Sequence, residues 1–241
     1  MTRSPVLQPP TAFTPVPVRR RVVGMKQLLL ICAVVALVGC GEKDDPNTGV
    51  VNPNKPSPKA VPVNIADPIV EKAIRKELKK RAIQGELTKA DLEKVTRLDL
   101  FDNQLTEVPK GLEKLTQLTE LELGGNQLTD VKGLEMLTQL TFLNLQSNQL
   151  TDVKGLEKLT KLTWLRLDYN KLTDVKGLEK LTQLKELWLD SDQLTEVPKE
   201  VEKLTQLKTL NLYGNPALTK AQIDQLQKAF PKCRISSNPK K

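Results

Sequence analysis

Carboxylates are the side chains of this sequence whose type and spacing could perform chemistry. Glu120 and Glu122 are two residues apart, which places both on one face of a strand, where a hydrolase with two carboxylates could use them. The sequence contains no histidine, which excludes histidine-based triads, general bases and metal ligands. It also lacks a glycine-rich phosphate loop and a Cys-x-x-Cys pair. We therefore predict solvated acidic side chains, no metal or other cofactor, and no enzymatic activity.

Aromatic rings are the second set of candidate residues, and they lie in or beside short leucine-x-leucine segments. These rings are Phe101, Phe142, Trp164, Tyr169, Trp188 and Tyr213. The same segments hold seven carboxylates against the bases Arg97 and Arg166; the carboxylates are Asp99, Asp102, Glu120, Glu122, Asp168, Glu186 and Asp190. Rings exposed together usually mark a recognition surface. The combination predicts a ligand with basic and apolar groups and argues against a nucleic acid, whose phosphates the acids would repel.

The leucine-x-leucine segments recur in six units, each with a polar residue at a fixed place. These residues are Asn103, Asn126, Asn148, Asn170, Asp192 and Asn215, and they are 22 or 23 residues apart. Each unit fits the pattern L-x-x-L-x-L-x-x-N-x-L, whose period of about 20–29 residues is that of a leucine-rich repeat. On these residues the chain resembles bacterial leucine-rich-repeat proteins of the internalin-like kind. The resemblance implies an α/β solenoid, a leucine-rich-repeat horseshoe with a parallel concave β-sheet and short 3₁₀ or extended returns.

The spacing within a unit predicts where its side chains point. Leu143 and Leu145 alternate on a short strand and face the interior. The asparagine turns the chain, and its amide satisfies backbone groups that the turn leaves unpaired. Gly155 and its equivalents permit backbone angles that other residues resist. Asp192 can accept but not donate hydrogen bonds, so we predict a looser turn there.

Equivalent positions of neighbouring repeats should lie about 4.8 Å apart across the sheet. Phe142 and Trp164 should therefore be side by side, with Trp188 extending the patch diagonally. Two other interpretations remain open at this point. The rings could gather here because the scaffold admits variation nowhere else, or they could pack in a homodimer, which nothing in the sequence indicates.

Both ends of the repeat array, which spans residues 95–218, have the pattern of a cap. Residues 63–94 predict a helical N-terminal cap, with Asp67 preceding one helix and a capping box of Thr88 and Asp91 in the next. Residues 219–241 predict a helix, a final edge strand and a loose tail. Cys233 lies in that strand, and we expect it to be a small buried residue.

The N-terminal region has the pattern of an export signal. Residues 25–39 carry a lysine and an apolar run too short to span a bilayer. The run ends in Leu37-Val38-Gly39-Cys40, which resembles the lipobox of bacterial lipoproteins and implies lipidation of Cys40 after cleavage before it. An ordinary signal peptide or a membrane helix is the alternative. Residues 1–24 read as an upstream extension that begins at a start codon placed too early, and residues 40–62 as a disordered tether.

The net charge of +8 is concentrated at the N-terminus. Residues 1–39 hold five bases and no acid, which weakens a nucleic-acid interpretation. The sequence predicts an exported protein, lipid-anchored to the cell envelope with the outer membrane slightly favoured, that binds a protein or peptide noncovalently on the concave face. The alternatives are a structural envelope lipoprotein without a specific ligand, and a glycan binder that stacks sugars on Trp164 and Trp188.

Overall fold

The computed structural model describes residues 61–78 and 85–238, all within the compact unit formed by residues 55–241. The predictions for residues 1–24, for the signal peptide 25–39 and for Cys40 therefore lie outside the described residues. No helix in the described ranges is long and apolar enough to cross a membrane.

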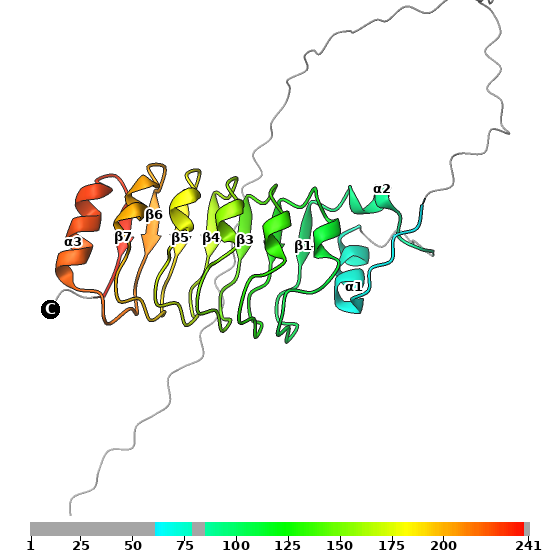
Figure 1. The fold of residues 1–241 in the computed structure, drawn as a ribbon, viewed down its shortest axis with the longest axis horizontal. Coiled ribbons are helices and arrows are strands. Elements are labelled where there is room, and N and C mark those ends of the chain that lie inside the picture. Colours follow the sequence, from blue (N-terminus) through cyan, green and yellow to red (C-terminus); the bar gives the residue numbers. More distant parts are fainter. Residues whose placement is uncertain (1–60, 79–84, 239–241) are drawn as a thin grey trace, which may run out of the picture. The chain divides into compact units, whose positions relative to one another are not determined.

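Seven short parallel strands stand side by side in chain order and form one sheet (Figure 1). They are β1 (Arg97–Asp99), β2 (Glu120–Glu122), β3 (Phe142–Asn144), β4 (Trp164–Arg166), β5 (Glu186–Trp188), β6 (Thr209–Asn211) and β7 (Arg234–Ser236). The central leucines of β1 to β6 pair in succession, as Leu143 does with Leu165, and Leu210 of β6 pairs with Ile235 of β7. Equivalent positions of the repeats are therefore neighbours in space.

The chain returns from one strand to the next through short 3₁₀ helices, as the resemblance implied. These are η1 (Leu112–Lys114), η2 (Leu134–Met136), η3 (Leu156–Lys158), η4 (Leu178–Lys180) and η5 (Lys199–Lys203). A left-handed glycine precedes the first four, as at Gly155, where φ is 102° and the N–H donates to Glu157 Oε2 at 2.6 Å. Because a Cβ is strained at this φ, the prediction that these turns need glycine is confirmed.

Aliphatic side chains from the strands and the return segments form one continuous core. In the third repeat, Leu143 and Leu145 come from the strand side, and Leu150, Leu156 and Leu159 from the return, all at 0% exposure. The inward alternation expected from the sequence is confirmed. Full burial of a leucine contributes about 1.5–3 kcal/mol, so layers of this kind account for the stability of the array.

Buried asparagine side chains tie each repeat to the one before it. Asn148 Nδ2 donates to the carbonyl oxygens of Leu123 and Leu145 at 3.0 Å, and Asn148 Oδ1 accepts the Leu128 N–H at 2.9 Å. Asn170 makes the equivalent bonds one repeat later. The amides thus satisfy backbone groups that the turns leave unpaired, as the sequence predicted.

Asp192 occupies the equivalent buried position in the fifth repeat, with 4% of its surface exposed. Its Oδ1 accepts the Leu172 N–H at 3.2 Å, whereas Oδ2 is buried with no hydrogen-bond partner among the described residues. Burial raises the pKa of this carboxyl to about 7. The looser turn stays a prediction, and its physical basis is the loss of the amide donors that Asn148 and Asn170 supply.

Capped helices close both ends of the array (Figure 1). α1 (Pro68–Glu77) begins after Asp67, whose Oδ1 accepts the Ile69 N–H, and α2 (Lys89–Leu92) begins with a Thr88–Asp91 capping box. α3 (Lys220–Ala229) begins at Thr219 and leads into the edge strand β7. These predicted caps are confirmed. Cys233 is buried as expected, and burial raises the pKa of its thiol.

Candidate binding surface on the concave face

The first and third residues of the strands form the open face of the sheet, called the concave face below. They lie in two rows that cross the strands. The first row consists of Arg97, Glu120, Phe142, Trp164, Glu186, Thr209 and Arg234. The second row consists of Asp99, Glu122, Asn144, Arg166, Trp188, Asn211 and Ser236. Parallel pairing in a constant register brings these residues together from distant parts of the sequence.

Phe142 and Trp164 stack at the centre of the first row. Their ring centroids are 4.1 Å apart and their planes differ by 8°. The prediction that they lie side by side is confirmed. Because the two residues are neighbours along the row, the outer ring faces point along it, toward Glu120 on one side and Glu186 on the other. Each ring covers part of the other, so both are half-buried rather than fully exposed.

Trp188 lies diagonally from Trp164, as predicted, and Arg166 is its partner in the second row. The Arg166 Cζ lies 5.4 Å from the centroid of the Trp188 ring. Arg166 Nε also donates to Asp168 Oδ1 at 2.7 Å, and Asp168 is 1% exposed. The ion pair neutralises the only basic charge in the centre of the described face and holds it over the ring.

The predicted carboxylates fall into two groups on either side of the stacked rings. On the β2 side, Glu120 Oε2 lies 3.5 Å from Arg97 Nε, and Glu122 accepts a hydrogen bond from Asn144 Nδ2 at 2.7 Å. Burial raises the pKa of Glu122. On the β5 side, Glu186 makes no ion pair with any residue that the structure describes. Glu120 and Glu122 are thus each held by a different neighbour, Arg97 and Asn144.

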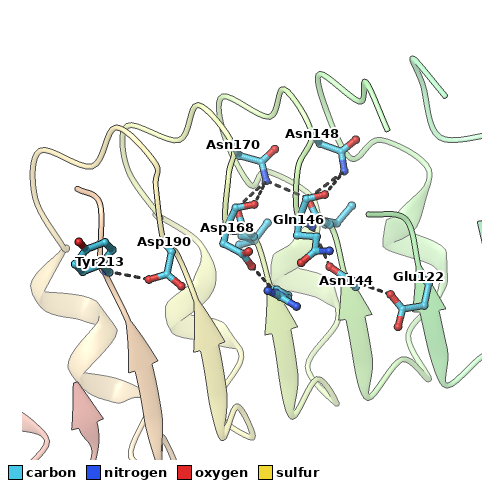
Figure 2. A network of polar contacts seen from close by, with 11 residues as sticks. Glu122, Asn144, Gln146, Asn148, Asp168, Asn170, Asp190 and Tyr213 are labelled. Carbon is cyan, nitrogen blue, oxygen red and sulfur yellow. Dashed lines mark hydrogen bonds and ion pairs between the residues drawn. The ribbon is translucent and has the colours of Figure 1, made fainter. Parts of the chain in front are cut away.

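Asp190 and Tyr213 extend the polar contacts along the edge of the face where the asparagine turns begin (Figure 2). Asp190 Oδ1 accepts the Tyr213 N–H at 2.9 Å. Burial raises the pKa of Asp190 to about 6, and the charge of Asp168 adds to the rise. Two strands earlier, the Gln146 N–H donates to Asn144 Oδ1 at 3.0 Å. Side chains on this edge are therefore fixed by their neighbours.

Three of the predicted rings are exposed beside the rows rather than within them. Tyr169, Tyr213 and Phe101 are 59%, 57% and 46% exposed. Tyr169 has a φ of 58°, a conformation that is costly for a bulky side chain. The equivalent residues of other repeats are small or short, namely Asp102, Gly125, Ser147, Ser191 and Gly214. Holding a tyrosine in this conformation costs about 1 kcal/mol.

The structure also places residues that the sequence analysis missed. Arg234 joins the first row because β7 continues the register of β6, so the rows carry a third base. Asp102, which was counted with the acids of the face, lies in the turn beyond β1 at φ 54°. Asn144 and Lys76 contact predicted acids, and Lys76 Nζ lies 3.1 Å from Asp99 Oδ2. Arg234 could have been found by aligning the sequence of the final strand with the strands of the repeats.

Hollows of pocket size lie at the ends of the array. One of about 370 Å³ lies between α1 and the turn that holds Phe101, and one of about 520 Å³ lies between the last turn and α3. Neither includes the stacked rings. Within the described ranges, no three acidic or cysteine side chains come together as metal ligands.

Comparison with known proteins identifies the repeats. A family pattern described as "Leucine Rich repeats (2 copies)" matches residues 93–136, 116–158 and 160–200. The fold is a leucine-rich-repeat solenoid. The family pattern, the open parallel sheet and the 3₁₀ returns agree on this point. Leucine-rich repeats commonly bind proteins, and solenoids in general use their extended concave surfaces for binding.

Solved structures with similar folds include bacterial leucine-rich-repeat proteins. An internalin (inlF) from Listeria monocytogenes matches with a TM-score of 0.59 and 24% identity, over 73% of this chain and 58% of that one. A leucine-rich-repeat protein of Leptospira interrogans matches with a TM-score of 0.49 and 30% identity, over 61% of this chain and 44% of that one. The chain thus spans little more than half the length of the internalin. No match was found among curated proteins.

Proposed function

We propose that this leucine-rich-repeat protein is an exported, lipid-anchored component of the cell envelope that binds a protein or peptide noncovalently on its concave face. The observation that carries the binding role is the Phe142–Trp164 stack at the centre of an open sheet. Large rings supply much of the energy of protein recognition when a partner covers them. The strands hold both rings in place before any ligand arrives, so binding costs little conformational entropy.

Noncovalent recognition fits the side chains of this surface better than catalysis. The sequence has no histidine to act as a base, and the carboxylates on the β2 side of the rings, Glu120 and Glu122, are held by Arg97 and Asn144. The strained Tyr169 at the edge of the face adds an exposed ring whose retention stability alone does not explain. Both features favour a surface that selects a partner.

A peptide-display selection tests the binding role. Random peptides are selected on the full chain and then measured against Phe142→Ala/Trp164→Ala, with Met136→Ala as the matched control. Met136 is 63% exposed in η2, away from the concave face. We expect the double variant to lose at least about tenfold in affinity, since each anchor of this kind contributes more than about 1 kcal/mol. Selected peptides that bind parent and double variant equally would refute the assignment, provided that thermal unfolding shows both to be folded.

The lipid anchor rests on the sequence Leu37-Val38-Gly39-Cys40 and has its own test. Cells expressing the parent chain and Cys40→Ser are labelled with a fatty acid, and their membranes are separated by density. The proposal expects label and outer-membrane recovery for the parent only. Equal labelling of both chains would refute lipidation at Cys40, and recovery of the parent chain in the inner membrane would refute the preference for the outer membrane.

A further inference from the structure

The order of side chains along the first row is nearly symmetric about the stacked rings. Glu120 precedes Phe142, and Glu186 follows Trp164, each on the adjacent strand. Arginines stand farther out at both ends of the row, Arg97 next to Glu120 and Arg234 two strands beyond Glu186. The row therefore reads base, acid, ring, ring, acid, threonine, base.

Each glutamate and the adjacent ring form one half of a site for a cation. The stack runs along the row, so the outer face of Trp164 is turned toward Glu186 and the outer face of Phe142 toward Glu120. A basic side chain at either place meets a carboxylate and a ring face together, and both attract it. Glu186 has no ion pair within the described residues. Glu120 shares Arg97 with Glu77, at 3.5 and 4.0 Å, so two acids face one base.

The distance between Glu120 and Glu186 determines how far apart two basic residues of a ligand must be. Three strand intervals of about 4.8 Å place them roughly 14 Å apart. An extended peptide advances about 3.4 Å per residue and turns alternate side chains to the same side, so residues i and i+4 are also roughly 14 Å apart. The side chain of residue i+2 then lies over the midpoint, which is the Phe142–Trp164 stack.

We propose that the first row binds an extended peptide segment that has two basic residues four positions apart and an apolar residue midway between them. The proposal rests on the binding function proposed above and names the ligand class. The two bases lie against Glu120 and Glu186, and the apolar side chain covers the edges of the stacked rings. Because the motif is symmetric, the peptide can run in either direction.

The neighbouring charges limit the site to two bases. Arg234 lies two strands beyond Glu186 and repels a third base placed farther along the peptide. The second row offers no competing place for an acidic ligand, because Arg166 is already paired with the buried Asp168. At the other end of the row, Arg97 likewise repels a base placed beyond Glu120. The row therefore recognises a short segment within a partner rather than a long basic tract.

Synthetic peptides with arginine, serine, leucine, serine and arginine in succession test the spacing. Versions with one serine removed or one added place the arginines three or five positions apart. Fluorescein-labelled peptides are titrated with the full chain and read by anisotropy. Both tryptophans of the chain lie on the concave face, so Trp164 emission in Trp188→Phe reports independently where the peptide binds. We expect the four-position peptide to bind about tenfold more tightly than either other peptide.

Charge variants test the contact with Glu186. Glu186→Gln should weaken the four-position peptide about fivefold and leave unchanged a peptide whose arginines are replaced by serine. Glu196→Gln is the matched control, because it removes the same charge from an exposed residue outside the strand, and it should change neither affinity. Glu120→Gln should act like Glu186→Gln but more weakly, since Arg97 already neutralises part of its charge.

The outcomes separate this inference from the binding function. If all three peptides bind with equal affinity and Phe142→Ala/Trp164→Ala abolishes their binding, the proposed spacing is overturned but binding on the rings is supported. Failure of every basic peptide, while the display selection yields ring-dependent binders without bases, overturns the ligand class alone. Failure of both experiments overturns the binding function as well.

Discussion

The two faces of the sheet differ in how much the side chains vary from one strand to the next. In β4, Leu165 faces the interior at 0% exposure, as do the central leucines of β2, β3, β5 and β6. Its neighbours Trp164 and Arg166 face the other way, and no other strand has the same residue at the equivalent position. The alternation of a strand thus separates the residues that stabilise the fold from those that select a ligand. The face can change without cost to the interior.

Among the described residues, Asp192 departs most from this division between interior and face. It replaces a buried asparagine of the interior and lies two residues from Asp190 at the edge of the face. Asn170 donates to three carbonyl oxygens, whereas the ionised Asp192 has no N–H to donate and leaves Oδ2 without a partner in the described structure. The comparison predicts that substitutions in the interior alter stability and that substitutions on the concave face alter binding. It also predicts that Asp192 makes stability depend on pH.

The largest effect is expected from the interior. Leu165→Ala removes a fully buried side chain from the central strand and should lower the free energy of unfolding by about 2–5 kcal/mol. Urea unfolding followed by circular dichroism measures the loss. Leu165→Met, which keeps the volume, should cost less than about 1.5 kcal/mol. A loss below about 1 kcal/mol for the alanine variant would contradict the assignment of Leu165 to a tightly packed layer.

The next effect concerns Asp192 and pH. Burial raises the pKa of this carboxyl from 3.8 to about 7, so between these values the folded state keeps a proton that the unfolded state has released. Its contribution to stability is complete below about pH 4 and is lost as the pH rises through about 7. Asp190, with a pKa of about 6, adds a smaller dependence of the same sign.

Asp192→Asn should remove most of this dependence and restore the amide donors. We expect a gain of about 1–3 kcal/mol near pH 7.5 and little change near pH 4, measured by urea unfolding across that range. Glu196→Gln is the matched control, because it removes one carboxylate from an exposed residue and leaves Asp192 and Asp190 in place. Parallel pH profiles for the parent and Asp192→Asn would show that the dependence arises elsewhere.

The smallest effect is expected at Tyr169. Tyr169→Asn places a residue that accepts positive φ at 58° and should raise the free energy of unfolding by about 0.5–1 kcal/mol. Tyr213→Asn, at an exposed tyrosine without positive φ, should give no such gain. If the ring of Tyr169 serves binding, the stabilised variant should also bind selected peptides less tightly. A destabilised Tyr169→Asn would contradict the inference of strain.

The fold could be predicted from the sequence because the same pattern of leucine and asparagine residues recurs in each repeat. Six asparagine or aspartate positions at a constant period define the register, and the register alone places Phe142 next to Trp164. The caps followed from local hydrogen-bonding rules at Asp67, Thr88 and Thr219, which need no tertiary information.

The details of the surface could not be predicted, because they depend on side-chain contacts between strands. The repeat period does not specify that Asp168 is buried or that Arg166 donates a hydrogen bond to it. Mutual covering of Phe142 and Trp164 makes them half-buried, whereas the sequence predicted exposed rings. Arg234 was missed because β7 follows a helix and carries no asparagine signal.

The constant register has a consequence for how the coding sequence can change. Residues 140–159 and 162–181 are identical at most positions, so recombination between the two copies can add or delete a whole unit. An added unit would insert one strand in phase and one more leucine layer, which leaves the core intact. It would also move Glu120 and Glu186 apart by about 4.8 Å. Lineages that gain or lose a unit would therefore change the length of peptide they recognise in discrete steps, with a folded protein at each step.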